Sequence, residues 1–412
     1  MTEEKKLRTH FLILGTFLPE DILKDVFIKD TFPHVQDYKF IKNFVSSLIY
    51  TKKVNLSFVS YLNVSDYPFF PQKIVKKIVW STKINNEELS GISVPFINTP
   101  ISKVITRFFS MLFYGYKTLL KNKKTQGIIV YGAYLPSLVS GYILSKTFKV
   151  PLIGILTDPP ALSNSRDNKI KKYLRKIEKI LTSLFLKKVN KLIVVNENLA
   201  IDFSPQTPYI VVNGFIDRHE FSNAKNKDEN IETNKNTIIF AYTGSIEKKY
   251  GIKELVEGFL KASVENAVLE ICGRGDFDNE LREISKNYRN IIYHGFVLPD
   301  KALEIQRRAH FLINTRPLNE SYTKYSFPSK MLEYMASGKP IITTLLPGME
   351  PYKDFLIILE DNNPETISKI IRKLCLDDYS KYIAIGIKAK EFVLKNNTIE
   401  ALGEKILNFL LF

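Results

Sequence analysis

The segment with the clearest chemical content is YSFPSKMLEYMASGKPII, residues 325–342. Pro328 lies in the first turn of a predicted helix, where Ser329 and Lys330 offer backbone N–H groups and a positive charge to an anion. Glu333 follows on the same helix in an apolar setting, and its carboxylate can accept two hydrogen bonds from the hydroxyls of a ribose. The alternative for Glu333 is an ordinary surface glutamate.

Two glycine turns that follow predicted strands also suit phosphate or nucleotide binding. In GSIEKKYGI, a turn at Gly244 and Ser245 is followed by Lys248, Lys249 and the start of a helix. Backbone N–H groups at such a helix start bind anions, and the ammonium groups add charge. In ICGRGD, Arg274 stands at the tip of the turn. A single G-x-G is also compatible with a plain tight turn.

Alternating strands and helices must position these residues. Strands are predicted at residues 10–15, 55–60, 127–132, 151–156, 191–196, 209–214, 237–244, 267–273, 290–296, 310–317 and 339–344. In the second half, helical patterns separate these strands at residues 252–263, 277–288, 299–309 and 326–338. This alternation is typical of doubly wound parallel sheets. We therefore predict an α/β protein with two Rossmann-like domains facing each other across a cleft.

Composition excludes several classes of protein. A chain of 412 residues with 45% hydrophobic and 25% charged residues is neither disordered, collagenous nor a coiled coil. Cys272 and Cys375 have no neighbours at metal-ligand spacing, which argues against a zinc module and suits a reducing cytoplasm. The polar start does not resemble a secretory signal. The uncharged residues 127–145 are interpreted as a strand and a helix rather than a membrane span.

The net charge of +16 is unevenly distributed. Residues 101–124 contain six Lys and Arg residues and no acid, and residues 163–191 contain ten against two acids. Both stretches also have apolar residues at helical spacing, so each is interpreted as an amphipathic helix with a basic face. The alternatives are an ordinary solvated face and attraction to an anionic membrane surface or substrate. Nucleic acid is disfavoured because no nucleic-acid-binding motif accompanies the charge.

Five ordered segments resemble the retaining GT-B glycosyltransferases of the large family 4. VVNGFIDRHEF resembles the exit from the family's first domain, and GSIEKKYGI and ICGRG resemble the loops of its second domain. YSFPSKMLEYMASGKPII resembles the family's E-x7-E helix, and residues 347–371 resemble the segment that follows it. The resemblance implies a GT-B fold over nearly the whole chain. Its parts would be an acceptor-binding domain, a linker, a nucleotide-sugar-binding domain and a C-terminal helix that packs back on the first domain, over residues 1–217, 218–236, 237–390 and 391–412.

The resemblance also assigns roles to individual residues. Glu333 matches the second glutamate of E-x7-E, which binds the ribose of the nucleotide. Ser329 and Lys330 match the helix start that holds the donor phosphates. Further residues near the nucleotide base and diphosphate would be Arg274, Phe296 and Val297.

Four positions depart from the family's pattern. Tyr325 replaces the first glutamate, which usually contacts the donor sugar, and Ser245 replaces a phosphate-binding arginine. Tyr250 stands where a lysine is usual, and Lys248 or Lys249 would reach the same phosphate. In the first domain, Asp158 stands where a histidine is common and is the candidate acceptor-side base. The alternative role for Asp158 is helix capping or loop structure.

The resemblance implies transfer of a sugar from a nucleotide-sugar donor, with a UDP-sugar favoured, and with retention at the anomeric carbon. Lys249, Lys330 and the helix start would stabilise the leaving diphosphate. The acceptor would be a glycan or a lipid-diphosphate-linked glycan of bacterial capsule, O-antigen or exopolysaccharide biosynthesis, at the inner face of the cytoplasmic membrane. No metal or other cofactor is expected, because the transfer scheme that the resemblance implies requires no metal. Two alternatives stay open: a catalytically degenerate partner subunit, and a nucleotide-sugar epimerase.

Overall fold

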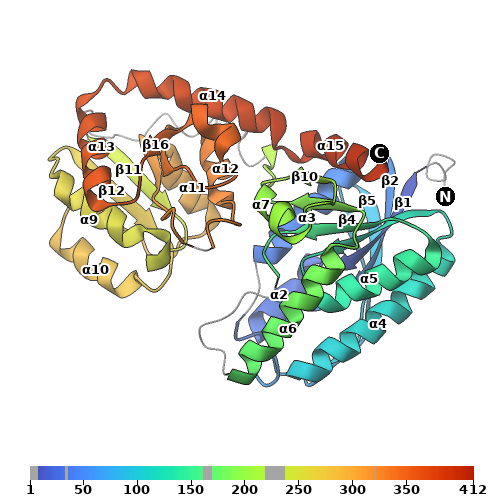
Figure 1. Ribbon diagram of the computed structural model, residues 1–412. Helices are drawn as coiled ribbons and strands as arrows, with labels where there is room; N and C mark the ends of the chain where they lie inside the picture. Colours follow the sequence, from blue (N-terminus) through green and yellow to red (C-terminus); the bar gives the residue numbers. More distant parts are fainter. Residues whose placement is uncertain (1–7, 33–35, 161–168, 219–236, 321) are drawn as a thin grey trace. The chain divides into compact units, whose positions relative to one another are not determined.

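The computed structural model describes residues 8–32, 36–160, 169–218, 237–320 and 322–412 (Figure 1). The chain divides into two compact units. The first unit contains the residues up to Phe215 together with Ile399–Phe412, and the second contains Ile216–Thr398. The second unit ends later than the predicted residue 390, because one continuous helix crosses that position. The predicted linker, except for its first residue, lies outside the described residues.

The first unit is built on an eight-stranded sheet with the order β10-β9-β8-β7-β1-β2-β5-β4. All neighbouring strands are parallel except β4 and β5, which form an antiparallel hairpin that the sequence pattern did not indicate. A two-stranded sheet, β3 with β6, accompanies it. The strands are β1 (Thr9–Gly15), β2 (Val54–Ser60), β3 (Ile74–Val75), β4 (Ile78–Ile84), β5 (Glu87–Ser93), β6 (Phe96–Ile97), β7 (Thr125–Tyr131), β8 (Leu152–Leu156), β9 (Lys191–Val194) and β10 (Tyr209–Val211).

Helices cover both faces of this sheet (Figure 1). They are α2 (Glu20–Lys29), α3 (Gln36–Tyr50), α4 (Pro100–Lys121), α5 (Leu135–Phe148), α6 (Lys169–Leu186), α7 (Glu197–Phe203) and α15 (Ile399–Leu411). Apolar residues of α3 and α15 pack with the strand residues that point to one face, for example Ile13 and Ile129. On the other face α5 lies so close that a Cβ on Gly141 would come within 2.7 Å of Val130. The central strands are therefore apolar on both faces, as parallel strands require.

The second unit has a six-stranded, fully parallel sheet with the order β13-β12-β11-β14-β15-β16. Its strands are β11 (Ile238–Thr243), β12 (Ala267–Cys272), β13 (Ile291–Tyr293), β14 (Phe311–Asn314), β15 (Ile341–Thr344) and β16 (Ile357–Leu359). Its helices are η3 (Lys248–Tyr250), α9 (Ile252–Ala262), α10 (Asp278–Asn287), α11 (Pro299–Arg308), α12 (Ser329–Ser337), η4 (Glu350–Phe355), α13 (Pro364–Leu376) and α14 (Ser380–Asn396).

The strand order of the second unit reverses direction between β11 and β14. The chain moves from β11 outward to β12 and β13, and then returns to β14 on the other side of β11. Loops that leave the carboxyl ends of β11 and β14 therefore diverge, and such a switch point is where open α/β sheets bind ligands. The two sheets confirm the predicted α/β class with doubly wound parallel strands.

Candidate functional site

The loops that follow β11 and β12 are joined by backbone hydrogen bonds. Gly244 N–H donates to the Cys272 carbonyl at 3.0 Å, and Ile246 N–H donates to the Arg274 carbonyl at 3.1 Å. Gly273 has a φ of +147°, and a Cβ there would lie 1.7 Å from the Gly244 carbonyl oxygen. Position 273 therefore requires glycine, because any side chain would collide with the backbone of the neighbouring loop. A plain tight turn would not impose this contact.

Arg274 and Phe296 make an exposed cation–aromatic pair beyond β12 and β13. The Arg274 guanidinium carbon lies 5.2 Å from the centre of the Phe296 ring, and the ring is 63% exposed. Gly273 N–H donates to the Gly295 carbonyl at 2.8 Å, so the two loops hold each other. Val297 packs partly against the core and fixes the end of this loop. An exposed guanidinium beside an aromatic ring is a surface on which a planar base can stack.

Helix α12 is tied to the end of β11 by a buried tyrosine. The Tyr334 hydroxyl accepts a hydrogen bond from Thr243 N–H at 2.8 Å and donates one to the Thr243 carbonyl at 3.2 Å. Burial raises the pKa of Tyr334 well above its usual range, so the hydroxyl stays neutral. Pro328 precedes the helix as its N-cap rather than lying within its first turn. The amino end of α12, with exposed Ser329, is therefore held beside the loop that begins at Gly244.

Lys330 and Glu333 form an ion pair near the start of α12. Lys330 Nζ lies 2.7 Å from Glu333 Oε2, and the two side chains are 40% and 20% exposed. The glutamate is thus half-buried at the site rather than a fully solvated surface residue. Tyr325 is also partly buried, with Lys324 Nζ 5.4 Å from its ring.

The two lysines after β11 differ in their surroundings. Lys248 Nζ forms a short ion pair with Glu280, and the Lys248 N–H donates to Asp276 Oδ1 at 2.7 Å. The hydrogen bond to Glu280 raises the pKa of Lys248. Lys249 is exposed, with its Nζ 5.1 Å from the Tyr250 ring. Of this pair, Lys249 is the better placed to meet an anion, because Lys248 is already neutralised by a carboxylate.

Arg316 is a site residue that the sequence reasoning missed. It follows β14, and its guanidinium carbon lies 4.3 Å from the centre of the Tyr250 ring. Tyr250 in turn packs edge-on against Tyr322, whose hydroxyl donates to the Lys249 carbonyl. Within the described part of the chain, Arg316 makes no ion pair. The available signal was its place at the end of a predicted strand, in HFLINTRP.

Asp158 belongs to the first unit, at the carboxyl end of β8. Thr157 Oγ1 donates to Asp158 Oδ2 at 3.0 Å. Desolvation by the surrounding protein atoms raises the pKa of this carboxyl group, while the residue keeps an exposed face. A raised pKa suits a proton-accepting group. The other predicted residues all belong to the second unit. There the structure brings Gly244, Ser245, both lysines, Arg274, Phe296 and α12 to one sheet edge.

Metal-binding side chains are not clustered in the described residues. No group of three or more His, Cys, Asp or Glu side chains there has the arrangement of a metal site. The Cys272 thiol is buried, which raises its pKa to about 11 and keeps it protonated.

The chain consists of two units, each built on a doubly wound, mainly parallel sheet. This architecture and the solved structures that match it show that the protein has the GT-B fold. Residues 223–392 match the family model described as glycosyl transferases group 1, and this match with the fold supports a GT-B glycosyltransferase. No curated protein gives a significant sequence match to the chain.

Solved structures of the same fold align over almost the full chain. HepE from Anabaena in complex with UDP has a TM-score of 0.60 and 13% identity, covering 98% of this chain and 99% of HepE. Sucrose-phosphate synthase from Thermosynechococcus elongatus has a TM-score of 0.61 and 12% identity, covering 97% and 98%. A structure described as trehalose-6-phosphate from E. coli bound with UDP-2-fluoro glucose has a TM-score of 0.63 and 10% identity, covering 98% and 99%.

Proposed function

We propose that this protein transfers a glycosyl group from a nucleotide sugar, with a UDP-sugar favoured, to a glycan or lipid-diphosphate-linked acceptor. The anomeric configuration would be retained, and the product would belong to a bacterial surface polysaccharide. The observation that carries the proposal is the convergence of four loops, those after β11, β12, β13 and β14, and helix α12 on one edge of the second sheet. This edge combines a base-stacking pair with two cationic side chains and a helix start.

The order of these groups along the sheet suits an elongated anionic ligand. Arg274 and Phe296 lie beyond β12 and β13, whereas Arg316 and Tyr250 lie beyond β14 and β11. Four neighbouring strands span about 14 Å, at about 4.8 Å per gap. A nucleoside diphosphate would place its base at the first pair and its diphosphate near the second pair and the start of α12. The ribose would then reach the Glu333 carboxylate.

The proposed chemistry is electrostatic stabilisation of the departing diphosphate. As the glycosidic bond breaks, negative charge develops on the phosphate oxygens, and fixed positive groups lower the energy of that state. Backbone N–H groups at Ser329 and Lys330, the Lys249 ammonium and the Arg316 guanidinium would supply the positive charge. Arg316 would replace the arginine and lysine that Ser245 and Tyr250 displace. Because these groups carry the charge, we expect turnover without a divalent metal, and activity in the presence of EDTA tests this.

The comparisons support parts of this proposal. HepE binds UDP, and UDP with glucose, in two of the aligned structures. A structural study of trehalose-6-phosphate synthase, with a TM-score of 0.63 at 10% identity, concerns glycosyl transfer with retention. Asp158 is proposed as the acceptor-side base, since its raised pKa favours proton uptake.

Calorimetric titration with UDP and with uridine tests the donor site. Glu333→Ala should weaken both ligands, since the ribose contact is common to both, by about 1–3 kcal/mol or roughly 5- to 150-fold. Arg316→Ala should weaken UDP binding and leave uridine unchanged, because only UDP carries the diphosphate. Lys248→Ala is the matched control, since its ammonium is already paired with Glu280. Unchanged affinities in the Glu333 and Arg316 variants would refute this placement of the nucleotide.

Turnover assays separate the proposed enzyme from its alternatives. Release of UDP from a UDP-sugar with an acceptor, and a product whose anomeric configuration by NMR matches the donor, would support the transferase. UDP binding without turnover for any donor and acceptor would identify a degenerate binding subunit. Conversion of one UDP-sugar into another without an acceptor would identify an epimerase.

A further inference from the structure

Helix α4 presents an apolar stripe on its outward face. Its packed side contains Met111, Gly115 and Leu119, and a Cβ on Gly115 would lie 2.5 Å from Leu144 of α5. The opposite side has six large apolar residues, each between 44% and 64% exposed: Ile101, Ile105, Phe109, Phe113, Tyr116 and Leu120. Their spacing of three or four residues aligns them along one line of the helix. A helix on the surface of a globular protein normally turns polar residues outward.

This finding corrects the basic face that the sequence predicts for α4. Lys103 and Arg107, two of the six basic residues in that stretch, are buried. Lys103 Nζ pairs with Asp66 at 2.6 Å, and burial lowers the pKa of Lys103 although Asp66 opposes the shift. The Arg107 guanidinium donates to the Leu62 carbonyl, and its carbon lies 4.0 Å from the centre of the Phe96 ring. Lys103 and Arg107 therefore bind partners in the interior of the first unit, and neither contributes to the outward face of α4.

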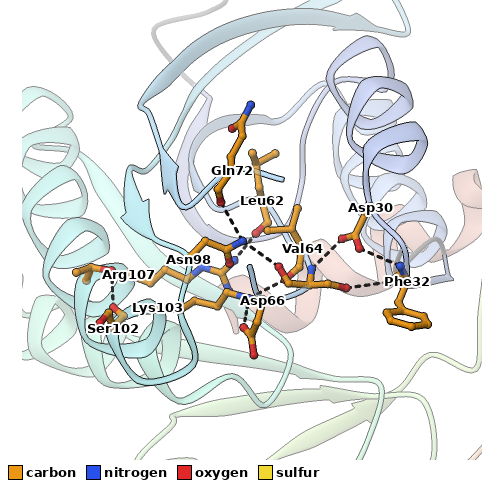
Figure 2. Close-up of polar contacts among 12 residues, drawn as sticks. Asp30, Phe32, Leu62, Val64, Asp66, Gln72, Asn98, Ser102, Lys103 and Arg107 are labelled. Carbon is orange, nitrogen blue, oxygen red and sulfur yellow. Dashed lines mark hydrogen bonds and ion pairs between the residues drawn. The ribbon is translucent and has the colours of Figure 1, made fainter. Parts of the chain in front are cut away.

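A network of polar contacts lies beside the first turns of α4 (Figure 2). Lys103 donates to the Val64 carbonyl at 2.8 Å, and Asp30 accepts hydrogen bonds from Ser65 N–H and Phe32 N–H at 2.8 and 3.0 Å. These bonds fix the segment after α2 and the loop after β2, whose aromatic side chains are exposed. They are Phe32, Tyr67 and Phe69, which are 53%, 46% and 53% exposed.

Helix α6 repeats the pattern of α4. Thr182 and Leu186 are buried, whereas the outward line consists of residues between 38% and 66% exposed: Tyr173, Ile177, Ile180 and Leu184. Helix α5 packs against both α4 and α6, through the ring pairs Tyr116–Phe148 and Tyr142–Phe185 at 5.4 and 5.5 Å. Part of the predicted basic stretch, residues 163–168, lies outside the described residues.

Lysines border both stripes, and acids are nearly absent. Exposed lysines within the two helices or just after their carboxyl ends are Lys117, Lys121, Lys123, Lys124, Lys176, Lys179, Lys187 and Lys188. Helix α4 contains no acidic residue, and α6 contains only Glu178. In the described part of the chain, no helix is long and apolar enough to cross a bilayer. Exposed apolar side chains with a cationic border are complementary to the surface of an anionic bilayer.

We propose that α4, α6 and the loop with Tyr67 and Phe69 form a docking surface for an anionic lipid bilayer. The apolar stripes enter the boundary between headgroups and acyl chains, and the bordering lysines contact lipid phosphates. Tyrosine is suited to this boundary because its apolar ring carries a polar hydroxyl, and phenylalanine adds apolar area that enters the acyl chains. The surface lies in the first unit, and its lipid binding does not depend on the proposed glycosyl transfer.

Vesicle co-sedimentation of the full chain tests this surface. Phosphatidylcholine vesicles with about a third phosphatidylglycerol should bind the protein, and pure phosphatidylcholine vesicles should bind it more weakly. The double variant Phe109→Ser/Phe113→Ser should lower the partition coefficient at least about tenfold, because about half of each ring leaves an apolar environment. Lys123→Glu/Lys124→Glu should weaken binding to the anionic vesicles only.

Control variants distinguish binding of a bilayer from binding of a protein at this surface. Leu376→Ser removes an equally apolar, 88% exposed side chain from the second unit and should bind vesicles like the wild type. Circular dichroism and thermal unfolding should be unchanged in all variants, because the altered side chains are exposed. No vesicle binding by the wild type, or equal binding by the Phe109/Phe113 variant, would overturn the proposal. So would a wild-type dimer in light scattering that this variant converts to a monomer, because a second copy would then occupy the face.

Discussion

Replacing Tyr334 by phenylalanine tests how helix α12 is held against the sheet. The substitution keeps the ring, so no cavity opens, but it removes the hydroxyl that bonds both the N–H and the carbonyl of Thr243. Both residues are almost completely buried, so water cannot replace the lost partner. A buried N–H left without an acceptor costs about 1–3 kcal/mol. For a unit of this size, that loss corresponds to a fall in Tm of about 2–12 °C.

Thermal unfolding followed by circular dichroism or calorimetry provides the measurement. Tyr288→Phe makes the same chemical change at a residue that is 47% exposed, and it should shift the Tm by less than about 1 °C. The Tyr334 variant should also bind UDP more weakly if the start of α12 holds the diphosphate. Equal Tm values for the two variants would show that the hydroxyl does not stabilise the junction of β11 and α12.

Four further predictions concern backbone conformation and the pH dependence of stability. Gly273→Ala should lower the unfolding free energy by at least about 3 kcal/mol, because its Cβ would lie 1.7 Å from the Gly244 carbonyl oxygen. Gly132→Ala, with a φ of +80° but open space around the Cβ, should cost only about 1–2 kcal/mol in the same denaturation assay. Burial lowers the pKa of His10 to about 4. Because the unfolded chain takes up this proton from about pH 6.5 downward, wild-type stability should fall by up to about 2 kcal/mol between pH 7 and pH 5, and His10→Gln should remove that slope. Burial opposes ionisation of Glu270, but its hydrogen bonds to a histidine and an arginine outweigh this and lower its pKa. Its contribution is therefore present above about pH 4.5 and lost in more acidic solution, so Glu270→Gln should flatten the acid limb of the stability profile.

The residues of the candidate site differ in how visible they are in the sequence. Ser329, Lys330 and Glu333 stand in one short segment whose helix begins after a proline and ends at Gly338, so local rules locate them. Arg274 follows a strand and a glycine, which is also a local signal. Arg316 was missed because its importance comes from Tyr250, a residue 66 positions earlier that only the pairing of β11 with β14 brings beside it.

The lysines also show that the sequence does not reveal contacts between distant residues. Lys248 and Lys249 are adjacent, and nothing in their spacing distinguishes them. The structure pairs Lys248 with Glu280 of α10 and leaves Lys249 beside an aromatic ring. The charge of Lys103 and Arg107 was likewise assigned to the surface, although α4 turns both inward to satisfy a loop.

The amino-acid sequence alone determined the α/β class and the parallel sheets, and it located the segments that we propose for nucleotide binding. Strand alternation, glycine turns and helix starts are local properties of the chain. Only the tertiary structure decided which cations remain unpaired and which face of α4 meets solvent. Those outcomes depend on partners far away in the sequence, and a periodic pattern specifies two faces of a helix without specifying which one the rest of the protein will cover.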